Sequence, residues 1–146
     1  MTRMQQVAAP DATLDALYRG TRFEVRAPGG LLLLQLDLPN PQLLAVHEQL
    51  RVTCSAFLTA WNPRSIPTPP EQNAAALEQL RQKIKGLGLV CWPGAGRDPT
   101  GAWPAEESLF VPGLELARAV QLGRDFDQHA IVHAQIDAVP RLIWLS

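Results

Sequence analysis

The hydrophobic positions of the chain repeat with two different periods, which divide it into short strands and helices. Residues 22–27 alternate apolar with charged side chains, which predicts a half-buried strand. Pro28-Gly29-Gly30 predicts a turn, and residues 31–36 predict the returning strand. This second strand is a continuous leucine run, so we expect apolar cover on both of its faces. The chain therefore begins with a predicted β-hairpin.

Helical spacing recurs around this hairpin. Residues 11–18 predict a short helix with Asp11 as its N-cap. Asn40 and Pro41 have the residue types of an N-cap and a first helical position, and they open a helix to about residue 50. Its spacing predicts an inward stripe that consists of Leu43, Val46 and Leu50, with His47 on the side of the helix.

Two longer helices are predicted in the second half. Thr68-Pro69-Pro70-Glu71 matches a capping box with Thr68 as N-cap, and Gly86 and Gly88 end that helix. Its predicted buried face comprises Leu77, Leu80, Ile84 and Leu87. Pro112-Gly113 is expected to open the last helix, whose predicted inner face comprises Leu116, Ala119, Val120 and Gly123.

The remaining apolar runs predict five more strands, at residues 53–61, 89–92, 108–111, 130–136 and 142–145. We expect a Gly- and Pro-rich loop over residues 93–107. The whole chain, 1–146, is then one α+β (α/β-type) domain, with a mixed, largely antiparallel sheet packed by about three main helices. Helices on one face of the sheet or on both would satisfy this order. Residues 1–10 are expected to form a flexible N-terminus.

Composition narrows the class of protein. The 146 residues are 47% hydrophobic and 18% charged with a formal net charge of −1, which favours a folded domain and gives no support for nucleic-acid binding. No apolar run is long enough to cross a membrane, and MTRMQQVAAP lacks the apolar core of a signal peptide. We therefore expect a cytoplasmic protein in which Cys54 and Cys91 stay reduced.

Polar side chains gather where predicted strands end. Thr59, Asn62, Arg64 and Ser65 lie at the C-terminal end of the strand over residues 53–61, and such ends are where ligands bind in open α/β sheets. The same residues are also suited to bracing a proline-rich turn through their own backbone. Both interpretations stay open on the sequence.

The other polar motifs are weaker. Gly94-Ala95-Gly96-Arg97-Asp98 follows a predicted strand but lacks the third glycine of a dinucleotide site and the Lys of a P-loop, so a flexible hairpin loop is the favoured interpretation. Glu106 and Asp98 flank the same loop and are suited to acid–base chemistry, although surface carboxylates are commoner there. His129 and His133 lie too far apart along a strand to share one ion, so no metal site is predicted.

Several of these residues recur in one pattern. The pattern consists of TAWNPRS, Glu71-Gln72-Asn73, Trp103 with Glu106-x-Ser108, Phe126-x-Gln128-x-Ala130, and an opening Tyr18-x-x-Thr21-x-Phe23. From about Tyr18 to Ile136 the chain resembles DUF3293, an uncharacterised bacterial family. Phe23 stands where the family motif is expected to have Tyr, and Asp127 where it is expected to have Gly. The resemblance implies no activity, and the cofactor stays unknown; it singles out Asn62, Ser65, Asn73, Glu106, Ser108 and Gln128.

The sequence therefore predicts a pocket for a small polar ligand, nucleotide- or sugar-like, and leaves open a hydrolytic activity at that pocket. Its expected ligand-binding residues are Trp61, Asn62, Ser65, Asn73, Trp103, Ser108 and Gln128, the tryptophans serving as walls and the amides as orienting groups. If the protein is an enzyme, Glu106 or Asp98 is the candidate base and Arg64 the group that steadies an anion.

The alternative is a protein-interaction or accessory domain, in which Trp61, Trp103 and the proline-rich loops form an exposed face for a protein partner. A third interpretation places both tryptophans in the core and uses the amides to brace loops.

Overall fold

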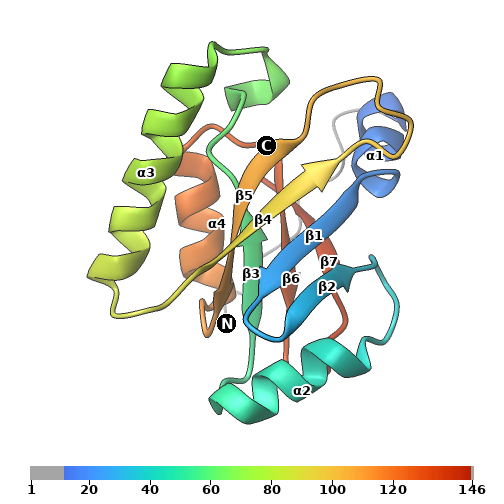
Figure 1. The fold of residues 1–146 in the computed structure, drawn as a ribbon, viewed down its shortest axis with the longest axis vertical. Helices are drawn as coiled ribbons and strands as arrows, with labels where there is room; N and C mark the ends of the chain where they lie inside the picture. Colours follow the sequence, from blue (N-terminus) through green and yellow to red (C-terminus); the bar gives the residue numbers. More distant parts are fainter. Residues whose placement is uncertain (1–11, 146) are drawn as a thin grey trace, which may run out of the picture.

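The computed structural model describes residues 12–145, which form one α+β domain around a single seven-stranded antiparallel sheet (Figure 1). The predictions for residues 1–10 and for Asp11 as a helix cap lie outside the described residues. The helices are α1 (Ala12–Arg19), α2 (Pro41–Leu50), α3 (Pro70–Gly86) and α4 (Leu116–Asp125), with a short 3₁₀ turn η1 (Pro63–Ser65) before α3. Among the described residues, no helix has both the length and the apolar content that crossing a membrane requires.

The strands are β1 (Arg22–Ala27), β2 (Gly30–Leu34), β3 (Ser55–Leu58), β4 (Trp92–Arg97), β5 (Glu106–Pro112), β6 (Ala130–Ala134) and β7 (Arg141–Trp144). They lie in the order β2-β1-β4-β5-β3-β6-β7, and every neighbouring pair is antiparallel. Three of the pairs are hairpins, β1–β2, β4–β5 and β6–β7, and β3 joins the last two in the middle of the sheet.

The sheet carries helices on both faces and has two separate cores. Helices α3 and α4 lie side by side on one face and contribute Leu80, Ile84 and Val120 to the first core. The other face is the inner side of the curled sheet, where α1 and α2 pack and where Val25, Phe110 and other side chains form the second core. The choice that the sequence left open, between one covered face and two, is therefore resolved in favour of two.

Contacts between the beginning and the end of the chain close the curl. The backbone N–H of Asp37, just after β2, donates to the carbonyl of Pro140, just before β7, at 2.7 Å. Arg19 at the end of α1 bonds to the Asp37 carboxylate at 3.0 Å. The Tyr18 ring meets Trp144 of β7 edge to face, with ring centroids 5.1 Å apart. Helix α1 is thereby held over the inner side of the curl.

Two strand predictions were wrong. The leucine run of β2 is not covered on both faces: Leu31 is 53% exposed while Leu32 and Leu34 are buried, because β2 is an edge strand with one face to solvent. Residues 94–97, expected in a flexible hairpin loop, form most of β4, which begins at Trp92 rather than at residue 89. A Cβ on Gly94 would lie 2.5 Å from the Glu24 carbonyl oxygen, so glycine is required here by the close approach of β1.

Helix starts were predicted with mixed success. Asn40 caps α2 as expected, because its side-chain oxygen accepts from Leu43 N at 3.0 Å. The inner face of α2 contains Leu43 and His47, whereas Leu50 is 41% exposed, so the placements of His47 and Leu50 were wrong.

The capping box at the start of α3 is absent. Pro69 is the N-cap, and the Thr68 hydroxyl donates to the Ile66 carbonyl instead. At the other end of that helix, Leu87 lies beyond its last residue and is 36% exposed. Helix α4 begins at Leu116 rather than at Pro112, because Pro112 ends β5 and Gly113 follows it with a φ of +84°.

Candidate functional site

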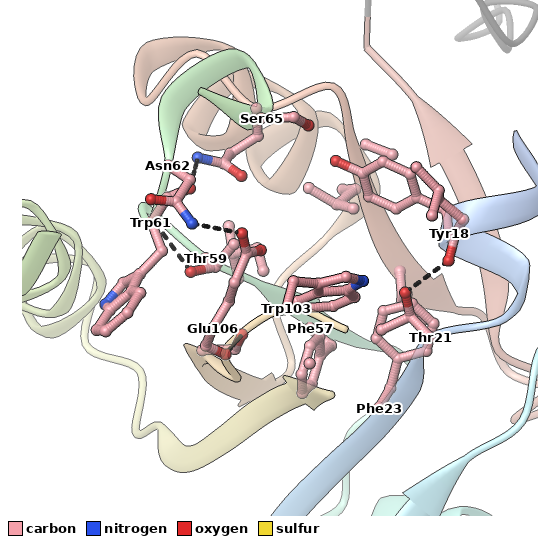
Figure 2. Close-up of a pocket in the computed structure, with 18 of the residues that line it drawn as sticks. Tyr18, Thr21, Phe23, Phe57, Thr59, Trp61, Asn62, Ser65, Trp103 and Glu106 are labelled. Carbon is pink, nitrogen blue, oxygen red and sulfur yellow. Dashed lines mark hydrogen bonds between the residues drawn. The ribbon is translucent and has the colours of Figure 1, made fainter. Parts of the chain in front are cut away.

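A cavity of about 400 Å³ opens at one end of the curled sheet, between α1, the η1 segment and the loop that joins β4 to β5 (Figure 2). This is the end at which β3 and β4 finish and β1, β5 and β6 begin. Its size lies within the usual range for a small-molecule site. Apolar side chains make up most of its walls, among them Leu14, Leu17, Tyr18, Phe23, Phe57, Trp103, Ile131, Val132 and Leu142.

The structure brings together most of the polar residues singled out in the sequence. The residues expected to bind ligand, Trp61, Asn62, Ser65, Asn73, Trp103, Ser108 and Gln128, all line the cavity, as does Glu106. Arg64 and Asp98 are not among its lining residues. The polar groups are therefore collected on the side formed by the β3 end, η1 and the start of β5.

Glu106 is the only charged residue that lines the cavity in the described part of the chain. Its Oε2 accepts a hydrogen bond from the Asn62 side-chain nitrogen at 2.8 Å, and none of the ion pairs among the described residues includes it. Burial raises the pKa of the Glu106 carboxyl, and the Asn62 hydrogen bond opposes that shift. Glu106 is thus a partly buried acid that an amide orients and that has no cationic partner within residues 12–145.

Asn62 and Asn73 form the support of this carboxyl. Asn62 adopts a left-handed conformation with a φ of +45°, which turns the chain from β3 into η1. Its side-chain oxygen accepts from Thr68 N and from the Asn73 amide, each at 3.0 Å, and its backbone N–H donates to Asn73 Oδ1 at 2.9 Å. The amide of buried Asn73 donates further to the Thr68 carbonyl at 3.1 Å. Asn73 therefore braces the loop, and Asn62 positions Glu106.

Other polar lining residues are also bonded to the chain itself. Gln128 Nε2 donates to the carbonyls of Trp61 and Phe126, each at 3.1 Å. The Thr59 hydroxyl donates to the Glu107 carbonyl at 2.6 Å and accepts from Trp61 N at 3.0 Å. The Ser108 hydroxyl donates to the Glu106 carbonyl at 3.0 Å. These bonds fix the backbone around Trp61 and Glu106, so much of the polar motif builds the site rather than facing a ligand.

Tyr18 of α1 is a cavity residue that the sequence did not single out for binding. Burial raises the pKa of its phenol; the Ser65 side chain of η1 opposes that shift by hydrogen bonding, and the Glu106 charge adds to the increase. In Figure 2 the Tyr18 hydroxyl points into the cavity from the side opposite Asn62 and Glu106. The available signal was the opening motif Tyr18-x-x-Thr21-x-Phe23, all three of whose named residues line the cavity.

The two tryptophans have different surroundings. The Trp103 indole lies in the middle of the view in Figure 2, beside Phe57, whereas the Trp61 indole is directed away from it. Trp61 packs against the first core, and its indole Nε1 is buried without a hydrogen-bond partner. The aromatic wall of the cavity is therefore formed by Trp103, Phe23 and Phe57. The rings of Phe23 and Phe57 meet edge to face, with their centroids 5.5 Å apart.

The two candidates outside the cavity have structural surroundings of their own. The Arg64 side chain is 71% exposed and lies 3.8 Å from the Asp127 carboxylate. The Asp98 carboxylate accepts from Thr100 N, Thr100 Oγ1 and Ala102 N at 2.8–3.0 Å, and the Thr100 backbone bond is the main cause of its lowered pKa. Both carboxylate oxygens of Asp98 therefore accept hydrogen bonds from within the β4–β5 loop and stabilise it. Of the carboxyl groups in the described residues, Glu106 alone lines the cavity.

Two buried histidines, His47 of α2 and His133 of β6, are not among the residues that line the cavity. His47 Nε2 is 2.8 Å from the Ser55 hydroxyl, and His133 Nε2 is 2.9 Å from the Leu114 carbonyl. Burial lowers the pKa of both imidazoles. Within residues 12–145, no group of three or more His, Cys, Asp or Glu side chains is arranged to hold a metal ion. Cys54 and Cys91 are both free thiols.

Comparison with known proteins identifies a family but no activity. The model of a family described as "Protein of unknown function (DUF3293)" matches residues 58–131, which is half of the chain. This stretch runs from the end of β3 to the start of β6 and includes Asn62, Asn73, Glu106 and Gln128. No curated protein and no solved structure matches the chain.

Proposed function

The chain belongs to the DUF3293 family, and from the geometry of its cavity we propose that the protein binds a small polar molecule beneath α1. The observation that carries the proposal is the convergence of Glu106 and the Asn62 amide on an otherwise apolar cavity of about 400 Å³. Binding sites for small molecules combine these features: apolar walls that supply contact area and a few convergent polar groups that orient the ligand.

The chemistry of the lining favours a nucleoside- or sugar-like molecule over a phosphorylated one. No Lys, Arg or His is among the lining residues in the described chain, so no cation is available to neutralise a phosphate. Trp103 and Phe57 offer ring faces for a base or a sugar, and Glu106 accepts from its N–H or O–H groups. The nucleotide-like ligand expected from the sequence is therefore narrowed here to one without a phosphate.

A hydrolytic activity receives less support than binding. Mechanisms that divide acid and base roles between two carboxyls require a second one in the site, and only Glu106 lines the cavity in the described residues. Arg64, the candidate for stabilising an anion, lies on the surface beside Asp127. We therefore propose binding as the primary function, with Glu106 as the residue through which any chemistry would proceed.

The alternative function, a protein-interaction domain, would use exposed aromatic and proline-rich segments. Trp61 and Trp103 are both partly buried, and the Trp61 indole packs on the first core. The exposed large apolar side chains include Leu17 on α1, Leu31 on β2 and Val90 before β4, which belong to different elements. The cavity therefore favours the small-molecule function. We also propose a cytoplasmic location, in keeping with the two free thiols.

The test is a thermal-shift screen of nucleosides, sugars, amino acids, amines and alcohols against the protein and a variant with a blocked cavity mouth. Ser65→Tyr places a large side chain at the exposed rim of the cavity. Thr53→Tyr is the matched control, because it adds the same side chain at an exposed position before β3 that does not line the cavity. A ligand at a hundred times its Kd adds about 2.7 kcal/mol, or several degrees in Tm. We expect a shift that Ser65→Tyr removes and Thr53→Tyr retains. A screen without any shift would overturn the proposal.

A further inference from the structure

The charge distribution around the cavity specifies more about the ligand than its size does. Glu106 is a carboxyl in a mostly apolar cavity with one hydrogen bond from Asn62, and no ion pair among the described residues includes it. A carboxylate offers about four acceptor positions on its two oxygens. Acceptor positions are therefore left on the one charged residue in the lining.

An acid so placed is unusual for a purely structural residue. Proteins place Glu at partly buried positions mainly when it is paired, because desolvation of the carboxylate is costly. The buried Asn73 amide of the same site, by contrast, is well paired: it makes three hydrogen bonds, two as donor and one as acceptor. Glu106 thus lacks the ionic compensation that a bound cation would supply.

The groups opposite Glu106 are also suited to a cation. The Tyr18 and Trp103 rings line the cavity, and the negative faces of aromatic rings attract an ammonium or amidinium group. Tyr18 and Glu106 line the same cavity, and the Glu106 charge adds to the rise that burial causes in the pKa of the Tyr18 phenol. No lining residue in the described chain would repel a positive charge.

Resting on the binding function proposed above, we propose that the ligand is a small organic cation: an amine or amidine on an apolar or aromatic body. Its charged head bonds to Glu106, and its body packs against Phe57 and Trp103. Asn62 keeps the carboxyl in place by its hydrogen bond to Oε2, which leaves Oε1 for the ligand. This narrows the class from polar molecules in general to those with a cationic head.

Three compounds with one indole body and different charges test this inference: tryptamine, the alcohol tryptophol and indole-3-propionic acid. Each is titrated calorimetrically into the wild type, Glu106→Gln and Glu107→Gln. Glu107 is the adjacent, exposed residue of β5, and it does not line the cavity, so its variant removes the same charge without changing the site. In the wild type and in Glu107→Gln alike, we expect the Kd of tryptamine to be at least about tenfold lower than that of tryptophol. The reason is that a charge-assisted hydrogen bond is worth roughly 1.5–3 kcal/mol. Glu106→Gln should lose this preference.

The outcomes separate this inference from the binding function itself. If tryptophol or the acid binds as tightly as tryptamine, and Ser65→Tyr removes that binding, the cavity binds ligands but the cationic class is wrong. Equal loss of the tryptamine preference in Glu106→Gln and Glu107→Gln would also overturn the inference, because net charge alone would then explain it. If none of the three binds and the wider screen gives no shift, both proposals fail.

Discussion

Asn62 and Asn73, eleven residues apart, hold each other through a reciprocal pair of hydrogen bonds. The Asn62 backbone N–H donates to Asn73 Oδ1 at 2.9 Å, and the Asn73 amide donates back to Asn62 Oδ1 at 3.0 Å. This pair fixes the left-handed turn after β3, joins it to the first turn of α3, and leaves the Asn62 amide nitrogen free to orient Glu106. The position of the Glu106 carboxyl is therefore fixed relative to α3 through Asn73 and Asn62.

Replacing Asn73 tests this bracing role. Asn73→Ala removes three hydrogen bonds at a buried position, at about 1 kcal/mol each, so we expect a loss of about 3 kcal/mol in the free energy of unfolding. Urea denaturation followed by circular dichroism measures it. Gln72→Ala, at the exposed neighbouring position of α3, should cost less than about 0.5 kcal/mol. Similar costs for the two variants would contradict the bracing role.

Glu106 should affect stability in the direction opposite to most acids. Because its pKa is raised in the folded protein, the carboxylate disfavours folding above that pKa, and the cost is relieved as pH falls through it. We expect Glu106→Gln to melt at a higher temperature than the wild type at pH 7, with the difference shrinking toward acidic pH. Differential scanning calorimetry across pH checks this, with Glu107→Gln as control. A lower Tm for Glu106→Gln at pH 7 would count against an uncompensated charge.

The buried histidines predict an acid-labile interior. The pKa values of His47 and His133 are lowered, so the unfolded chain takes up protons first, near the ordinary value of about 6.5. Stability is then lost as pH falls from about 6.5 toward the lowered folded pKa values. The double variant His47→Leu/Ser55→Ala removes one titrating group together with its hydrogen-bond partner, so neither is left unpaired. Its urea midpoint should fall less than that of the wild type between pH 7.5 and pH 5.5. Parallel pH curves would show that His47 is not responsible.

Gly94 should tolerate no side chain. A Cβ there would lie 2.5 Å from the Glu24 carbonyl oxygen and 2.9 Å from the Phe57 ring, so β1 and β4 would have to separate. We expect Gly94→Ala to lower the free energy of unfolding by about 3 kcal/mol, at the upper end of the usual cost of overpacking. Gly29→Ala is the matched control, since nothing lies within 4 Å of its Cβ. Thermal unfolding of the two variants gives the comparison, and equal Tm values would contradict the contact.

Asp127 offers a stabilising substitution. It has a φ of +54°, in the left-handed region that favours glycine, and it stands where the family motif is expected to have Gly. Asp127→Gly should raise the free energy of unfolding by about 0.5–1 kcal/mol, because its exposed pairing with Arg64 at 3.8 Å contributes little. Asp127→Ala removes the same carboxylate but keeps the backbone strain. If the Ala variant is as stable as the Gly variant, the backbone is not the cause.

The order of the elements was predictable because each is specified locally. The alternation in β1 and the Asn40-Pro41 start of α2 were recognisable without any tertiary information. The Gly-rich β4 was not, because glycine disfavours strands in general. Glycine is required at position 94 of β4 because the Glu24 backbone of the neighbouring strand β1 lies so close to it. The capping box predicted at Thr68 was wrong for a similar reason, because a contact distant in sequence decides the structure. The hydrogen bonds that hold the start of α3 come from Asn62, which lies outside the helix.

The polar part of the site was predictable and its walls were not. Asn62, Glu106 and Gln128 are conspicuous because amides and acids are unusual at the ends of buried strands. Phe23 and Phe57 carry no such signal, since their sequence pattern is that of any core residue. Whether an apolar side chain ends in a cavity or in packed interior depends on how the sheet curls, which no local pattern specifies.

The cavity takes its lining from Leu14 of α1 to Leu142 of β7 and is closed by contacts between the two ends of the fold. It therefore cannot exist in any partly folded fragment, and a chain still emerging from the ribosome has nothing with which to hold a ligand until β7 is made. Under the binding function proposed above, occupancy of the cavity would oppose unfolding of the entire domain rather than of one loop, once β7 has joined the sheet. Ligand supply would then set how long each molecule survives proteolysis, so abundance of the protein in the cell would follow abundance of its ligand.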